Sequence, residues 1–272
     1  MGNFKPEDYE MPFVQLSVGK VHYLEQGTGT PLLLLHANPG DSQDYAAVIP
    51  TLAKQYRVIA LDWLGYGLSD RPLHPEQLNM DDFYLMFREF LTALSLPPAL
   101  MIGNSFSGNI ILRLASEVPE QVRGLVMISS AVFSPQNLFT QFFCRFQGSR
   151  FSVAPYYFAK LYLHERNDIT HGMLNRAATT QSREAPKQLN RALWRNFALP
   201  NDLLLAACAN IKTSTLICFG DKDPVVPAKK NSKVALRYLP HAELVTFPCG
   251  HAPFAELPTE FLKHVLPFLD QH

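Results

Sequence analysis

A serine lies at the junction between two predicted elements of this chain. Ser105 belongs to the sequence G-N-S-F-S-G at 103–108, which follows the apolar run 98–102 and precedes a helical pattern. A sharp turn between a buried strand and a helix exposes a serine hydroxyl at the edge of a sheet, where it can act as a nucleophile. Gly103 and Ser107, two residues before and after the serine, are small enough for the strand and the helix to approach closely. We therefore predict that Ser105 is a nucleophile.

The last third of the chain supplies a base and an acid for such a serine. A serine hydroxyl reacts readily only when a base takes its proton and an acid orients that base. The apolar run 215–219 leads into Asp221 and Asp223, and the run 244–247 leads into His251. In an open parallel sheet, ligands bind at the edge formed by the carboxyl ends of the strands. We predict that His251 is the general base and that one of the two aspartates orients it.

These residues need a sheet that brings several strand ends together. Apolar strands alternate with amphipathic helices over most of the chain, which predicts an α/β fold with a mostly parallel sheet covered by helices on both faces. The predicted strands cover 13–18, 21–24, 31–35, 57–61, 98–102, 122–128, 215–219 and 244–247, the first two forming a hairpin. The predicted helices follow Ser105 and also cover 43–53, 81–94, 234–239 and 261–269.

The stretch Phe133–Pro200 interrupts this alternation. It has no strand pattern and is rich in aromatic and arginine side chains. We predict several short helices inserted between two core strands, which form a mobile cap over Ser105. Most of the aromatic side chains would form the core of the cap, and the others would line a pocket for an apolar substrate.

Several segments, taken in order, resemble the α/β-hydrolase superfamily. They are H-A-N-P-G at 36–40, D-W-L-G-Y-G-L-S at 62–69, the elbow at 103–108, G-D-K-D at 220–223 and G-H-A-P-F-A-E at 250–256. The resemblance implies the α/β-hydrolase fold, with a mostly parallel eight-stranded sheet, helices on both faces and an inserted helical cap. The implied division is a core domain formed by 1–132 and 201–272, with the cap at 133–200.

The resemblance also assigns the acid. The family's acid occupies the last place of a G-x-x-D turn, which is Asp223 here, so Asp223 is preferred over Asp221. The family's histidine lies in G-H-x-P-x-x-E, and this position is His251. Asp62 lies in a loop that we interpret as scaffold, and it is a further alternative for the acid.

The turn at 36–40 resembles the family's H-G-x-P-G turn, with Ala37 in place of glycine. In the family this turn helps to build an oxyanion hole, in which backbone N–H groups stabilise the charge that develops on a carbonyl oxygen. The implied donors here are the N–H groups of Asn38 and Phe106. His36 is expected to brace the turn.

The charge and hydrophobicity of the chain limit which kinds of binding partner we expect. The chain has 272 residues, 47% of them hydrophobic, and its 24 basic and 24 acidic residues give a formal net charge of zero. It has no basic tract of the kind that holds nucleic acid or anionic lipid. Its apolar runs are too short for a membrane span, and its start lacks the pattern of a signal peptide, so we expect a cytoplasmic protein. The expected partner is a small apolar or aromatic substrate, and both a monomer and a homodimer remain open.

The spacing of the four cysteines bears on metal binding and on disulfide bonds. Cys144, Cys208, Cys218 and Cys249 show no paired spacing. Neither a zinc site nor a disulfide framework is therefore predicted, in keeping with a reducing compartment. We expect no metal and no cofactor.

A serine nucleophile limits the reactions that we expect this protein to catalyse. A serine suits acyl transfer to water, so we expect a serine hydrolase that cleaves an ester, thioester or lactone of a small to medium apolar substrate through an acyl-enzyme. Haloalkane dehalogenases and epoxide hydrolases of the family use aspartate at the elbow, and Ser105 disfavours both. The alternatives are a meta-cleavage type of C–C hydrolase, which usually has tryptophan where this chain has Ala252, and a binding protein without turnover.

Overall fold

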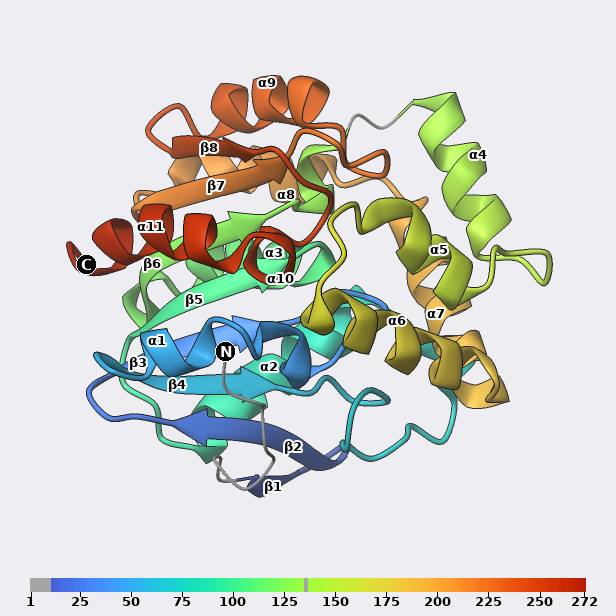
Figure 1. Ribbon diagram of the computed structural model, residues 1–272, viewed down its shortest axis with the longest axis horizontal. Coiled ribbons are helices and arrows are strands. Elements are labelled where there is room, and N and C mark those ends of the chain that lie inside the picture. Colours follow the sequence, from blue (N-terminus) through green and yellow to red (C-terminus); the bar gives the residue numbers. More distant parts are fainter. Residues whose placement is uncertain (1–10, 135–136) are drawn as a thin grey trace.

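One mixed sheet forms the centre of the computed structural model, which describes residues 11–134 and 137–272 (Figure 1). The strand order is β1-β2-β4-β3-β5-β6-β7-β8; β2 is antiparallel to β1 and β4, and all other neighbours are parallel. The predicted mostly parallel eight-stranded sheet is therefore confirmed. The strands are β1 (Phe13–Leu16), β2 (Gly19–Gln26), β3 (Thr30–Leu35), β4 (Tyr56–Leu61), β5 (Ala99–Asn104), β6 (Val122–Ile128), β7 (Thr215–Gly220) and β8 (Glu243–Phe247).

Helices cover both faces of this sheet (Figure 1). The α-helices are α1 (Ile49–Leu52), α2 (Met80–Ala93), α3 (Phe106–Glu117), α4 (Leu138–Gln147), α5 (Pro155–Tyr162), α6 (Asp168–Gln181), α7 (Glu184–Phe197), α8 (Asp202–Ala207), α9 (Ala228–Tyr238), α10 (Pro253–Glu256) and α11 (Pro258–Leu269). Single turns of 3₁₀-helix are η2 (Ser42–Tyr45), η3 (Pro75–Gln77), η4 (Pro119–Gln121), η5 (Ala131–Phe133) and η6 (Cys208–Asn210).

Alternate residues of each central strand enter two separate cores. In β3, Leu33 and Leu35 pack into the core that also contains side chains of α2 and α3. Leu32 and Leu34 pack on the other face, with side chains of α1 and α11. All four leucines are fully buried. A parallel strand covered on both faces shows a continuous apolar run, which is the pattern at 31–35.

The predicted single helix at 43–53 is wrong. Two short helices, η2 and α1, take its place. Asp41 caps η2, because its carboxylate accepts the Gln43 N–H at 3.0 Å while Asp44 accepts the Asp41 N–H at 3.3 Å. Pro50 lies in the first turn of α1, where a residue without an N–H is tolerated, so the helical pattern restarts there.

Four helices, α4–α7, follow one another in the chain between β6 and β7. Figure 1 shows them gathered on the side of the molecule toward which the parallel strands point. Trp194 of α7 packs edge-on against Phe158 of α5 and Phe143 of α4, with ring centroids 5.1 and 5.6 Å apart. No strand occurs among the described residues of 137–200.

Candidate active site

Ser105 occupies a sharp turn between β5 and α3. Its φ is 57° and its ψ is −119°, a positive-φ conformation that a residue other than glycine adopts only when its surroundings impose it. Its N–H donates to Ile128 O of β6 at 2.8 Å, which fixes the turn against the sheet. A Cβ atom at Gly103 would lie 2.9 Å from the backbone of Ser107, so glycine is needed before the turn.

Ser107, two residues after Ser105, makes side-chain contacts of its own. Its hydroxyl donates to His36 O at 2.5 Å and accepts the indole N–H of Trp63 at 2.9 Å. His36 Nε2 accepts the backbone N–H of Trp63 at 3.1 Å. This buried network joins the elbow to the turn at 36–40, and a glycine could not take part in it.

His251 and Asp223 form a buried pair. The distance from His251 Nδ1 to Asp223 Oδ2 is 2.6 Å. The other carboxylate oxygen accepts the N–H groups of Val225 at 2.8 Å and Val226 at 3.1 Å. Because Nδ1 faces the carboxylate, Nε2 is the ring nitrogen available to a reacting group. Asp221, the rival candidate, is exposed to solvent.

Tyr162 at the end of α5 contacts the histidine from the other side. Its ring centroid lies 5.1 Å from that of His251, and its carbonyl oxygen accepts the His251 N–H at 3.0 Å. Ser105 and His251 line one cavity, but in the described part of the chain their side chains are not hydrogen-bonded to each other. Hydrogen bonds between catalytic groups are often long before substrate binds and shorten in the complex.

A buried glutamate, Glu256, holds the histidine loop and was not among the predicted site residues. Glu256 accepts the N–H groups of Gly250 at 3.0 Å and Ala252 at 3.1 Å, on either side of His251. It also accepts the N–H of His164 at 2.7 Å, from the segment that leads out of α5. The available signal was the last position of the G-H-x-P-x-x-E pattern.

The two backbone groups implied as oxyanion donors flank the serine. Phe106 is the first residue of α3, so its N–H has no acceptor within the helix. Asn38 follows β3 at the same edge of the sheet and lines the cavity together with Ser105. Ala37 is absent from the described residues with positive φ, so alanine fits where the family has glycine.

The side chain of Asn38 is held by two residues that the sequence analysis did not single out. The Tyr66 hydroxyl donates to Asn38 Oδ1 at 2.8 Å, and Asn38 Nδ2 donates to Asn190 Oδ1 at 2.9 Å. Tyr66 lies in the loop after β4, whereas Asn190 belongs to α7. No sequence signal could have found Asn190, because it is 152 positions away from Asn38.

A small, mainly apolar cavity contains Asn38, Ser105 and His251, and its volume is about 70 Å³. Most of its wall consists of Phe143, Cys144, Phe158, Tyr162, Trp194, Phe197, Val225 and Val226. Among the described residues that line it there is no lysine, arginine or carboxylate. Such a wall suits an uncharged, apolar substrate group.

Asp62, the further alternative for the acid, lies in the scaffold and pairs with another histidine. Its Oδ2 atom is 2.7 Å from His22 Nδ1, and the carboxylate accepts the N–H groups of Ser42 and Leu68 at 2.6 and 2.9 Å. Burial by itself would raise the pKa of Asp62, but these hydrogen bonds, with that of His22 first, hold the pKa below its usual value. Asp62 therefore contacts His22 and not His251.

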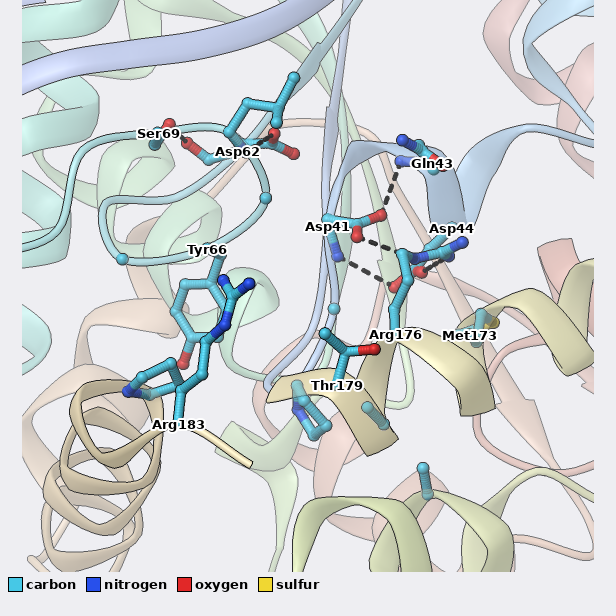
Figure 2. A pocket seen from close by; sticks show the side chains of 18 of the residues that line it. Asp41, Gln43, Asp44, Asp62, Tyr66, Ser69, Met173, Arg176, Thr179 and Arg183 are labelled. Carbon is cyan, nitrogen blue, oxygen red and sulfur yellow. Dashed lines mark hydrogen bonds and ion pairs between the residues drawn. The ribbon is translucent and has the colours of Figure 1, made fainter. Parts of the chain in front are cut away.

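A second cavity of about 280 Å³ is lined by several charged side chains, and Tyr162 forms part of its wall and of the wall of the first cavity. Figure 2 shows Arg176 of α6 pointing toward two acids. Its guanidinium lies 2.8 Å from Asp41 and 2.5 Å from Asp44. Burial, and then the charge of Asp44, raises the pKa of Asp41, whereas the charge of Arg176 lowers it. This cluster links α6 to η2 and contains no nucleophile.

Cys144 is a thiol in the wall of the apolar cavity. Burial raises its pKa to about 11, so the thiol is protonated near neutral pH and does not compete with Ser105 as a nucleophile. No cluster of three or more His, Cys, Asp and Glu side chains in the described residues is placed to hold a metal ion. Of the helices in the described ranges, none is long and apolar enough to cross a membrane.

Known proteins resemble this chain over different lengths. It is 33% identical to haloalkane dehalogenase 2 of Mycobacterium tuberculosis over 151 residues, which are 54% of this chain and 52% of that protein. It is 43% identical to 2-hydroxymuconate semialdehyde hydrolase of Pseudomonas sp. (strain CF600) over 110 residues, 39% of this chain and 38% of that one. The chain thus spans about half the length, or less, of these curated relatives.

The resemblance to solved structures extends over the whole fold. The crystal structure of a membrane phospholipase A, described as a bacterial virulence factor, superposes with a TM-score of 0.82 and 25% identity, over 97% of this chain and 86% of that one. The family model for the alpha/beta hydrolase fold matches residues 30–258. Since this match covers β3 to β8, the turn at Ser105 and the histidine loop, the chain belongs to the α/β-hydrolase family.

Proposed function

We propose that this protein is a serine hydrolase that cleaves an ester, thioester or lactone of a small to medium apolar substrate. The observation that carries the proposal is the contact of 2.6 Å between His251 Nδ1 and Asp223, at the cavity that Ser105 also lines. This arrangement leaves His251 Nε2 available for the serine proton.

In the proposed reaction, His251 takes the hydroxyl proton of Ser105 as Oγ attacks the carbonyl carbon. Asp223 keeps the other proton on Nδ1 and stabilises the imidazolium that forms. The bond to the leaving alcohol or thiol then breaks, the leaving group receives the proton from His251, and the acyl group stays on Ser105. A water molecule deprotonated by His251 then attacks the acyl carbon. The bond to Ser105 Oγ breaks, Oγ receives the proton from His251, and the carboxylic acid leaves.

The negative charge on the tetrahedral intermediate needs donors in fixed positions. The N–H groups of Asn38 and Phe106 supply them in this proposal. Loss of one donor of this kind typically costs about 3 kcal/mol of transition-state stabilisation. The network from Ser107 to His36 supports this role, since it ties the turn at 36–40 to the elbow.

A C–C bond hydrolase is the second candidate. It is favoured by the 43% identity to 2-hydroxymuconate semialdehyde hydrolase. A muconate-type substrate carries a carboxylate, whereas the described wall of the cavity has no lysine or arginine to pair with it. The ester is favoured by this apolar wall and by the resemblance to a phospholipase A, whose name denotes ester cleavage.

We also propose that 133–200 is a cap and that 1–132 and 201–272 form the core domain. Residues of α4, α5 and α7 make up much of the cavity wall. The cavity volume of about 70 Å³ is well below the ~300 Å³ at the lower end for ordinary small-molecule sites, so substrate access requires these helices to shift.

Covalent labelling tests the nucleophile. A fluorophosphonate should label the protein, and mass spectrometry should find the adduct on the peptide that contains Ser105. The Ser105→Ala variant should remain folded, lose labelling and lose ester hydrolysis. An adduct on Ser107, or full hydrolysis by Ser105→Ala, would contradict the assignment.

A series of substrates tests which type of bond the protein cleaves and whether its pocket is apolar. We expect kcat/KM for p-nitrophenyl esters to rise roughly fourfold for each added CH₂ until the cavity is filled, because burial of a CH₂ contributes about 0.8 kcal/mol. An aryl diketo acid, cleaved at a C–C bond, should be a poor substrate. A flat ester series together with rapid cleavage of the diketo acid would favour the second candidate.

A further inference from the structure

Exposed apolar side chains are concentrated on α4, α5 and the loop between them. Leu138, Phe139 and Phe142 of α4 are 85%, 79% and 70% exposed. We call the whole group the α4–α5 surface, which consists of Leu138, Phe139, Phe142, Phe146, Phe151, Val153, Tyr157 and Leu161. Single exposed apolar residues are common on proteins, but a group of this size marks a contact surface.

The members of this surface share one face of each helix. On α4 the exposed side chains follow helical spacing, and they are Leu138, Phe139, Phe142, Arg145 and Phe146. The opposite face of α4 buries Cys144 and Gln147. On α5 the exposed Tyr157 and Leu161 are four residues apart and therefore lie on one face.

The inner faces of the same two helices line the apolar cavity. Phe143 of α4 and Phe158 of α5 are both part of its wall, with ring centroids 6.4 Å apart. Figure 1 shows α4 and the loop to α5 at the outer edge of the molecule, away from the sheet. These helices thus separate the cavity of Ser105 from the exposed aromatic groups.

The charged side chains among these exposed groups are all basic. Arg145, Arg150 and Lys160 are exposed, and the sequence contains no aspartate or glutamate between Glu120 and Glu165. In the described part of the chain, none of the three cations has a carboxylate partner. This surface therefore carries three cations and no carboxylate of its own.

We propose that the α4–α5 surface docks on an anionic lipid–water interface. Helices that lie in such interfaces place aromatic and leucine side chains at the boundary of the acyl chains, with cations facing anionic headgroups. A two-fold contact between two copies of the chain would bring Arg145, Arg150 and Lys160 of each copy together without a carboxylate, so it lacks this charge complementarity. Docking would place the helices that line the cavity next to the acyl-chain region of the lipid, where apolar acyl compounds are concentrated.

This proposal departs from the expectation that the chain does not bind anionic lipid. That expectation rested on the balanced total charge and on the absence of a basic tract. Three cations spread over 145–160 form no tract, and only the folded helices place them among exposed aromatic groups.

Cosedimentation with vesicles tests the proposal. The intact chain should sediment with vesicles of phosphatidylcholine and phosphatidylglycerol, should be released by high salt, and should bind vesicles of phosphatidylcholine alone far more weakly. A variant with Arg145→Gln, Arg150→Gln and Lys160→Gln should bind on the order of 100-fold more weakly at low salt, since each cation near such a membrane contributes about fivefold.

A matched pair of variants tests the apolar part. Phe139→Ser combined with Phe142→Ser should weaken vesicle binding at least about tenfold, because two side chains lose their insertion. Leu73→Ser is the control, since Leu73 is 94% exposed and lies outside the surface. Hydrolysis of a dissolved ester should be unchanged in these variants, because none of the three residues lines the cavity.

Three outcomes would overturn the proposal. They are no sedimentation with anionic vesicles, equal sedimentation of the intact chain and the Phe139/Phe142 variant, and self-association without vesicles that this variant abolishes in analytical ultracentrifugation. The binding measurement needs no turnover. Its failure is therefore distinguishable from failure of the proposed serine hydrolase, which the labelling of Ser105 tests.

Discussion

Asp223 is held in one orientation by contacts with His251, Val225 and Val226. At the scale of single residues, this makes Asp223→Asn an informative change. An amide favours the wrong tautomer of the histidine, so we expect kcat/KM to fall by about 10³–10⁴ while the folded structure persists. Asp221→Asn is the matched control and should keep nearly full activity, since Asp221 is exposed. Steady-state kinetics and circular dichroism check both variants, and a larger loss in Asp221→Asn would reverse the assignment.

The burial of His36 implies that the stability of the folded protein depends on pH. Its Nδ1 lies 2.7 Å from Ala37 O and its Nε2 accepts the Trp63 N–H, so the neutral ring fits both contacts. Burial is the main cause that lowers the pKa of His36 below its usual 6.5. As the pH falls, His36 of the unfolded chain is protonated near pH 6.5, whereas His36 of the folded chain is protonated only at a lower pH. The stability that is present above pH 6.5 is therefore lost as the pH falls.

We expect the contribution of His36 to the free energy of unfolding to decrease by up to about 1.4 kcal/mol per pH unit below its ordinary pKa. Urea unfolding at a series of pH values measures this slope. His36→Gln should be less stable near neutral pH and should show a smaller slope in acid. An unchanged slope in the variant would show that other groups cause the acid sensitivity.

At the scale of elements, α7 holds the turn after β3 through the side chain of Asn38. Tyr66→Phe removes one hydrogen bond to Asn38, and Asn190→Ala removes the other. We expect each change to lower kcat roughly 3–10-fold with a smaller change in KM, because a hydrogen bond of this kind is worth about 1 kcal/mol and fixes the proposed oxyanion donor. Lys187→Ala on the same helix is the control. A loss confined to KM would instead indicate a role in substrate binding.

Removing the cation from the ion cluster between α6 and η2 should lower the stability of the protein. Arg176→Gln leaves the carboxylates of Asp41 and Asp44 without their cation. Breaking a buried pair costs about 3–5 kcal/mol, but the side chain of Arg176 is 30% exposed, so we expect a decrease of roughly 1–3 kcal/mol in the free energy of unfolding. Arg183→Gln, at an exposed position of the same cavity, should change little. Urea unfolding of both variants checks the difference.

At the scale of the whole molecule, binding a substrate larger than the small cavity of Ser105 requires motion of its walls. The central strands are fully buried, whereas α4 buries only Cys144 and Gln147. We therefore expect amide hydrogen exchange to be much faster at 138–162 than in β5 and β6. A phosphonate bound to Ser105 should slow exchange in α4 and α5 if they close over it. Equal protection of these helices and of the strands, with or without inhibitor, would contradict a mobile cap.

The agreement between sequence and structure varies with the kind of element. Strands β3, β5 and β6 match their predictions closely, because a strand buried on both faces must be apolar at every position. Helix α9 begins at Ala228, earlier than the predicted 234, because its first turns carry lysines that face solvent and show no apolar pattern. The prediction of one helix at 43–53 was wrong, because a capped 3₁₀ turn and Pro50 divide the helical pattern into two short helices.

By itself the sequence determined where most strands lie along the chain, the turn at Ser105 and the candidates His251 and Asp223, because each depends on local patterns of a few residues. Tertiary structure decided which acid faces His251, since Asp221 and Asp223 differ only in how the turn after β7 packs. It also decided the contacts of Asn38 with Asn190, the apolar wall of the cavity and the exposed face of α4. These features join segments far apart in the chain, and no local pattern encodes which distant side chains the folded sheet and helices bring together.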